Sequence, residues 1–166
     1  MQHLVDSIAT SLADLPGWLA TMIISAMPIA ELRGGIPVAV GVYDLAIMEA
    51  YLWAVIGNMI PVFFILWLLP SISKWLSERS KYAKRFFDWL FARTKRKFYD
   101  KHEKWGNFAL FLFVAIPLPV TGAWTGSLAA FLFGIPKKQA IPYIFLGVLT
   151  AGVIISLATA GVITIF

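Results

Sequence analysis

Three long stretches of this 166-residue chain carry no charged residue, and this feature limits its fold more than any other. They span residues 50–73, 105–136 and 139–166, and are 24, 32 and 28 residues long. An apolar run of more than about 18 residues is typical of a helix that crosses a lipid bilayer. Only 14% of the residues are charged, against about 25% in soluble domains. We therefore predict an all-α polytopic membrane protein and no enzymatic activity. The absence of Cys also excludes a secreted disulfide scaffold.

Basic residues are concentrated in the segment 71–105, which contains eleven basic and four acidic residues and carries a net charge of +7. Lys and Arg beside a membrane span mark its cytoplasmic side. We therefore place 71–105 and Lys137–Lys138 in the cytoplasm, and Asp44 and Glu49 outside the cell membrane. Because the segment adjoins membrane spans, we expect no nucleic-acid partner for it.

Two segments have the pattern of amphipathic helices that lie on a membrane surface. In 71–105 the apolar residues recur on one helical face, while Lys and Arg fill the other. This pattern predicts a basic helix on the anionic inner membrane surface, with a solvated helical linker as the alternative. Residues 2–14 also have helical apolar spacing, and we predict a short interfacial helix there.

The stretch 105–136 has the wrong length for simple spans. Its 32 residues would form a helix of about 48 Å, whereas the bilayer core is about 30 Å thick and two crossings need about 40 residues. Its middle, residues 117–126 (PLPVTGAWTG), contains two prolines and two glycines, which interrupt a regular helix. We therefore predict a re-entrant helical hairpin over residues 106–135, which enters from the cytoplasm and turns near the bilayer midplane.

Residues 18–43 repeat this pattern around the stretch 28–37 (PIAELRGGIP), which superposes on the second break at an offset of 89 residues. A predicted transmembrane helix follows each hairpin, over residues 50–70 and 139–166. If the segment 71–105 is cytoplasmic, the first hairpin opens outside and the second inside, so that the two copies form an inverted repeat. Such repeats of broken helices are an architecture of secondary transporters. The alternative is that 18–43 crosses the membrane once as a distorted span.

Glu31 and Arg33 lie within the first break, and ionisable side chains at bilayer depth are costly unless they are paired or solvated. On a regular helix, residues two apart would point to opposite faces. Between Pro28 and Gly34–Gly35, however, the backbone need not be helical, and both side chains could line one pocket. Glu31 would then exchange a proton between the two sides, and Arg33 would bind an anionic group. The alternative is that they pair only with each other or with the backbone, and fix the turn.

The second break offers polar groups without charge. Thr121, Trp124 and Thr125 are candidate substrate- or ion-binding residues, together with Asn58 in the first predicted span. Hydroxyls in membrane helices often bond only to backbone, and Asn58 would serve equally as a packing hydrogen bond between helices. We expect no metal site and no cofactor, because the chain lacks Cys and its two His are far apart. The residues that we assign to the structure of the two turns are Pro28, Gly34, Gly35, Pro37, Pro117, Pro119, Gly122 and Gly126.

The two breaks, together with Gly57–Asn58 and Pro61, resemble the putative small multidrug export protein family over nearly the whole chain. The resemblance implies an ion-coupled membrane transporter. That family in turn distantly resembles the DedA superfamily, which shares inverted re-entrant hairpins, and this implies movement of polyprenyl phosphate or phospholipid instead. The second break has no Arg, so the resemblance to DedA is architectural and does not extend to a phosphate-binding role there.

Three functions therefore remain open. The leading hypothesis is a proton-coupled secondary transporter of an amphipathic or small organic substrate, with Glu31 as the coupling carboxylate and Arg33 as a substrate or charge-balancing group. The second is a lipid flippase or scramblase, and the third is a non-transporting assembly factor that organises partners through the basic segment. We expect contacts with membrane lipids and, since two long spans are few for an enclosed pathway, a homodimer.

Overall fold

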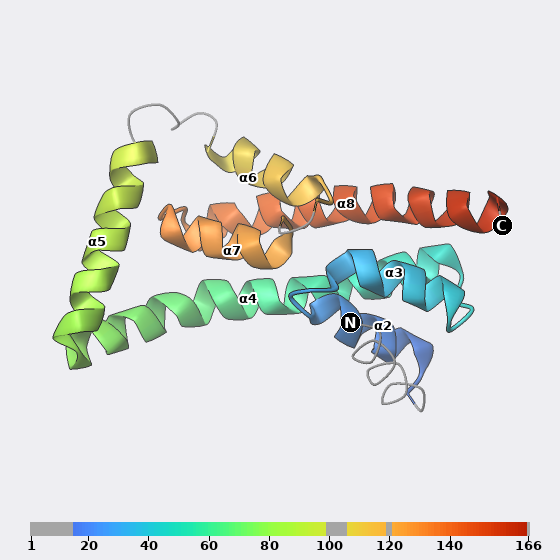
Figure 1. Ribbon diagram of the computed structural model, residues 1–166, viewed down its shortest axis with the longest axis horizontal. Coiled ribbons are helices and arrows are strands. Elements are labelled where there is room, and N and C mark those ends of the chain that lie inside the picture. The colour runs from blue at the N-terminus through green and yellow to red at the C-terminus, as the bar shows by residue number, and fades with distance from the viewer. Residues whose placement is uncertain (1–14, 99–105, 119–120, 166) are drawn as a thin grey trace.

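The computed structural model describes residues 15–98, 106–118 and 121–165, and every regular element in these ranges is a helix (Figure 1). The predicted all-α class is therefore confirmed for the described residues. The predicted helix over 2–14 and the turn residue Pro119 lie outside them. The helices are α2 (Gly17–Ala26), α3 (Glu31–Gly41), α4 (Ile47–Arg79), α5 (Lys81–Phe98), α6 (Gly106–Ala115), α7 (Ala123–Leu132) and α8 (Lys137–Ile165).

The two long helices, α4 and α8, lie side by side and run in opposite directions (Figure 1). Both are long and apolar enough, by length and composition, to cross a membrane. Their 33 and 29 residues correspond to about 50 and 44 Å of helix, which exceeds the bilayer core of about 30 Å. Ala54 and Val62 of α4 are buried, whereas Phe64 and Trp67 are 61% and 62% exposed. A helix that is apolar on its inner and outer faces suits a membrane rather than water.

Helix α4 continues beyond the predicted span of 50–70 and ends at Arg79. Pro61 and Pro70 lie inside it, and the helix ends only where Ser80 has extended backbone. Residues 71–79 contain no glycine or proline, so nothing in them stops the helix. The basic segment, which we predicted as one unit, is thus divided between the last turns of α4 and the separate helix α5.

Two short helical hairpins flank the long pair. Helices α2 and α3 are joined by a turn at 27–30, and α6 and α7 by the segment 116–122. Helix α7 begins at Ala123, inside the predicted break of 117–126. The hairpins open toward opposite ends of α4 and α8, and their turns meet near the middle (Figure 1). The most extensive contacts of α2 are with α4 and those of α6 are with α8, whereas α3 and α7 each contact both long helices.

The first break is shorter than predicted. Helix α3 begins at Glu31 and includes Gly34–Gly35 and Pro37, so the backbone from Glu31 onward is helical where the sequence had left a non-helical backbone open. Pro37 removes only one backbone N–H, and the loss of a single hydrogen bond does not end a helix that packs against neighbouring helices. The glycines serve close contact with α2 instead, because a Cβ at Gly35 would lie 1.9 Å from Ser25 Oγ.

Glycines also let the hairpins approach the long helices. A Cβ at Gly57 of α4 would lie 2.3 Å from the carbonyl oxygen of Met22 in α2. A Cβ at Gly147 of α8 would lie 2.7 Å from Cβ of Val114 in α6. Helices in membranes associate through such small residues, because lipid supplies no hydrophobic drive between them. The apolar core around these contacts includes Leu32, Ile36, Val62, Val114, Ile144 and Val148.

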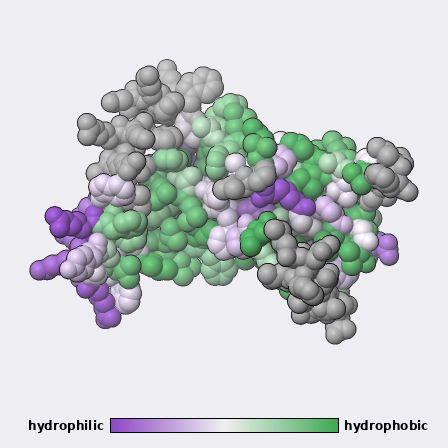
Figure 2. Space-filling model, viewed as in Figure 1, coloured by the Kyte–Doolittle hydropathy of each residue, from purple (hydrophilic) through white to green (hydrophobic). Residues whose placement is uncertain are grey.

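Helix α5 turns away from α4 and lies across one end of the long pair (Figure 1). Hydrophilic residues gather at the junction of α4 and α5 and in a smaller patch near the centre of the molecule, whereas the surface between the two is mostly apolar (Figure 2). Lys84 and Arg85 are exposed, and so are Tyr82, Phe86 and Trp89. The three aromatic residues recur at helical spacing, which is the pattern of a helix with one apolar face.

Candidate functional site

The turns of the two hairpins are joined by hydrogen bonds at the centre of the fold. The indole Nε1–H of Trp124 donates to the carbonyl oxygen of Ala26 at 3.0 Å. The backbone N–H of Trp124 donates to Glu31 Oε1 at 3.2 Å, across 93 residues of sequence. The Nη1–H of Arg33 donates to the carbonyl oxygen of Leu118. Three of the predicted site residues, Glu31, Arg33 and Trp124, therefore lie together and connect the two turns.

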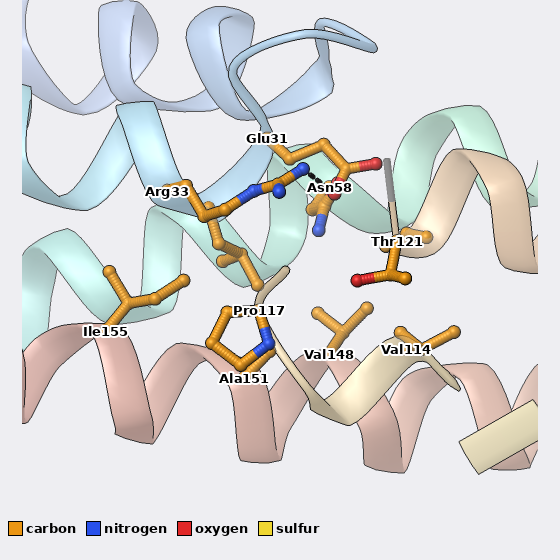
Figure 3. Close-up of a pocket in the computed structure, with 12 residues that line it drawn as sticks. Glu31, Arg33, Asn58, Val114, Pro117, Thr121, Val148, Ala151 and Ile155 are labelled. Atoms are coloured by element: carbon orange, nitrogen blue, oxygen red, sulfur yellow. Dashed lines mark ion pairs between the residues drawn. The ribbon is translucent and has the colours of Figure 1, made fainter. Parts of the chain in front are cut away.

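Glu31 is the first residue of α3 and is only 5% exposed. Its φ of 47° lies in the left-handed region, which side chains other than glycine seldom adopt. Its side chain carries Oε2 to within 3.6 Å of Nη2 of Arg33 (Figure 3). The pairing that a regular helix would prevent is thus present. Strained backbone at a buried charged residue is a mark of functional sites.

The carboxylate of Glu31 caps a helix of the other hairpin. The N-cap residue of α7 is Gly122, which has no side chain to accept a hydrogen bond. The first N–H groups of a helix lack partners within the helix and favour a negative charge. A Cβ at Gly122 would lie 1.8 Å from Glu31 Oε2. Gly122, which we predicted as a turn residue, therefore determines whether Glu31 can reach α7.

A small cavity lies beside the ion pair. It has a volume of about 10 Å³, which is near the lower limit for one water molecule. Glu31, Arg33, Asn58 and Thr121 line it, together with apolar residues of α8 such as Val148 (Figure 3). Asn58 is 2% exposed, and its Oδ1 has no hydrogen-bond partner among the residues that the structure describes. Because a buried carbonyl oxygen without a partner costs about 1–3 kcal/mol, Asn58 Oδ1 is suited to accept a bond from water or a ligand.

The two predicted threonines bond to nearby backbone. Thr121 Oγ1 accepts from the N–H of Leu118 at 3.1 Å and lies 2.8 Å from the carbonyl oxygen of Ile116, to which it donates. Thr125 Oγ1 donates to the carbonyl oxygen of Gly122 at 3.3 Å. Both hydroxyls therefore stabilise the second turn, which is the local role that we set beside ligand binding. Thr121 also lines the cavity, but Thr125 does not.

The remaining turn residues have distinct positions. Pro28 is exposed in the first turn, and Pro117 lines the cavity. A Cβ at Gly34 would lie 2.8 Å from the Cβ of Ala30. A Cβ at Gly126 would lie 2.5 Å from a methyl group of α6, so glycine lets α6 and α7 touch.

Sequence reasoning missed the backbone acceptors at Ala26 and Leu118, because residue type carries no signal for a carbonyl group. It also missed Ala151 and Ile155 of α8 as cavity-lining residues, since both are ordinary in an apolar helix. Within the part of the chain that the structure describes, no three His, Cys, Asp or Glu side chains are placed to hold a metal ion.

Comparison with known proteins identifies one family. The family model described as "Putative small multi-drug export protein" matches residues 31–154, which is most of the chain and includes Glu31, Arg33, Asn58 and both long helices for most of their length. The resemblance drawn from the two breaks is therefore confirmed. No curated protein and no solved structure matches.

Proposed function

The chain belongs to the putative small multi-drug export protein family, and we propose that it is a proton-coupled secondary transporter whose gate is the contact between its two hairpin turns. The family and the two long apolar helices support a membrane export protein. The observation that carries the gate is the position of Glu31. Its one carboxylate both caps α7 and pairs with Arg33 where the turns meet.

We place α4 and α8 across the membrane, with the hairpins re-entering from opposite sides as an inverted repeat. The opposite opening of the hairpins in Figure 1 supports this arrangement. So do the contacts of Gly57 with α2 and of Gly147 with α6, since each joins the long helix of one half to the first leg of its own hairpin. Helix α5 and the start of α8 lie at the end where the second hairpin opens, and their basic residues support a cytoplasmic location for that end.

Protonation of Glu31 would open this gate. The ionised carboxylate favours both the N-terminus of α7 and the guanidinium of Arg33. A neutral carboxyl group loses most of both attractions, so the contact between the turns weakens and Arg33 becomes available to a substrate. Release of the proton restores the contact. Because the hairpins open toward opposite ends, separation at the turns removes the barrier between the two sides of the membrane.

Glu31→Gln tests the coupling, because it keeps the size of the side chain and removes its charge. In proteoliposomes we expect export of a fluorescent amphipathic dye driven by a pH gradient to fall by at least about tenfold. Circular dichroism and gel filtration of the variant should remain unchanged. Glu49→Gln is the matched control, since Glu49 is exposed in the first turn of α4. Proton-coupled export by Glu31→Gln at the wild-type rate would refute the proposal.

The same preparation separates the other functions. A lipid flippase or scramblase would move a labelled anionic lipid without a pH gradient, and Arg33→Ala would impair it more than Glu31→Gln. For an assembly factor, the cellular phenotype would be unaffected by both substitutions and would depend on the basic residues of α5.

A further inference from the structure

Beside the proposed gate, an open groove of about 480 Å³ lies between α3 and the C-terminal half of α8. This volume lies in the range of about 300–1,000 Å³ that is typical of small-molecule sites. Its walls are mostly apolar, and Arg33 is the charged residue among those that line it. The apolar walls include Pro37, Gly41, Ile154, Ala158 and Val162.

The groove and the small cavity meet at the gate. Arg33, Pro117 and Ile155 line both. In Figure 3, Pro117 lies between Arg33 and α8, which carries Ile155. Gly41 is eight residues beyond Arg33 on α3, so the groove extends about 12 Å from the gate, enough for a chain of on the order of eight carbon atoms.

The polar end of the groove is cationic. The side chain of Arg33 is 27% exposed and that of Glu31 is 6% exposed, and Glu31 lines the cavity but not the groove. Among the residues that the structure describes, a molecule in the groove therefore meets a guanidinium group and no carboxylate. Within the described residues, the contacts with Leu118 and Glu31 engage only part of the five N–H donors of Arg33. A phosphate or carboxylate group can bind such a planar fork through two parallel hydrogen bonds.

We propose that this groove binds an amphipathic anion, with its phosphate or carboxylate group on Arg33 and its apolar chain between α3 and α8. The inference rests on the proposed function, because it names the substrate class for the same gate. The anionic group competes with the carboxylate of Glu31 for the guanidinium.

Octyl phosphate tests the charge preference. The full chain is purified in a neutral detergent, and binding of radiolabelled octyl phosphate is measured by equilibrium dialysis. Binding of octyltrimethylammonium, which has the same chain and the opposite charge, is measured in the same way for comparison. We expect the anion to bind at least about tenfold more tightly, as a charge-assisted bidentate bond provides. Arg33→Gln should abolish this preference, while Arg33→Lys should retain part of it. Inorganic phosphate alone should compete weakly, because it lacks the apolar chain.

Two glycine substitutions test the location. At both Gly41 and Gly161 a Cβ would meet no atom within 4 Å, but only Gly41 lines the groove. Gly41→Leu fills the groove and should weaken octyl phosphate binding by about tenfold. Gly161→Leu adds the same side chain elsewhere on α8 and should bind as the wild type does. If Gly41→Leu does not fold, Ala158→Leu fills the groove from the opposite wall.

Three outcomes would overturn the inference. Equal binding of the anion and the cation would mean that the groove has no preference for charge and accepts any apolar chain, as a surface covered by bulk lipid does. Binding that survives both groove-filling substitutions would place the site elsewhere. A change of oligomeric state in Gly41→Leu, measured by light scattering and without a change in binding, would mean that a second copy of the chain covers the groove.

Two further arms separate the source of the anion and the two proposals. If phosphatidic acid in nanodiscs displaces octyl phosphate, the groove accepts a membrane lipid. If only single-chain anions compete, it accepts a free amphipath, and either result supports the shared chemistry. If octyl phosphate does not bind while export still requires Glu31, only the proposal of an anion-binding groove is refuted. If octyl phosphate binds normally while Glu31→Gln leaves export unchanged, only the proposed function is refuted.

Discussion

Replacement of Gly122 by Ala is the sharpest test of the contact between the hairpins. The added Cβ would lie 1.8 Å from Oε2 and 2.6 Å from Cδ of Glu31. The carboxylate is the end of a flexible side chain, so we expect it to rotate away while the backbone stays in place. Glu31 then loses its hydrogen bond to the N–H of Trp124, and α7 loses its cap.

The cost has two parts. A hydrogen bond to a charged group contributes about 1.5–3 kcal/mol, and this part is lost with the cap. Gly122 also has φ 156° and ψ −166°, a region that is essentially restricted to glycine, which adds about 1–3 kcal/mol for alanine. Gly122→Ala should therefore lower the free energy of unfolding by about 2.5–6 kcal/mol.

A double-mutant cycle with Glu31→Ala separates the two parts. Without the carboxylate only the backbone strain remains, so the coupling free energy between the two substitutions should be about 1.5–3 kcal/mol. Unfolding would be followed by tryptophan fluorescence in mixed micelles of dodecyl sulfate and a neutral detergent. Gly134→Ala is the control, because Gly134 has φ 68° but a Cβ there would meet no atom within 4 Å. It should cost about 1–2 kcal/mol, unchanged by Glu31→Ala.

Additive effects of Gly122→Ala and Glu31→Ala would refute the reasoning, since they would mean that the carboxylate does not depend on the space at Gly122. The same conclusion would follow if Gly134→Ala were coupled to Glu31→Ala as strongly.

The remaining predictions concern topology, the cavity and helix packing. This chain has no native Cys, so Asp44→Cys should react with a membrane-impermeant maleimide only from outside the cell, and Lys84→Cys only from the cytoplasm. Labelling of both from one side would contradict the inverted arrangement. Asn58→Leu replaces a buried unpartnered carbonyl with a methyl group of similar size, so unfolding measurements should show stability unchanged or raised by about 1 kcal/mol, while dye export falls. An unaltered export rate would remove Asn58 from the site. Gly57→Ala should lower the unfolding free energy by about 1–3 kcal/mol because its Cβ would collide with the backbone of α2, whereas Gly161→Ala should leave it unchanged or raise it by up to about 1 kcal/mol. Equal effects of the two substitutions would show that α2 and α4 do not touch at Gly57.

Much of the fold could be read from local pattern. Uncharged runs indicated where the long helices lie, and the two proline- and glycine-containing breaks indicated where the hairpins turn. The extent of each break could not be read in this way, because the outcome at Gly34–Gly35 depends on whether α2 lies close enough to require a residue without a side chain. Where α4 ends was missed for a related reason. Pro70 has the pattern of a boundary, but the helix continues to Arg79.

The candidate site divides similarly. Glu31 and Arg33 could be singled out, because a charge in an apolar chain is conspicuous whatever its partners. Their pairing at a spacing of two joins side chains that a regular helix would point to opposite faces, and no local rule predicts it. The sequence by itself therefore determined the helical membrane class and the few residues able to carry charge through it, because hydropathy and charge are properties that each residue brings with it. Only the tertiary structure decided that Glu31 caps α7 across 93 residues and that Arg33 faces a groove of α8, because capping and exposure depend on where distant backbone lies in space.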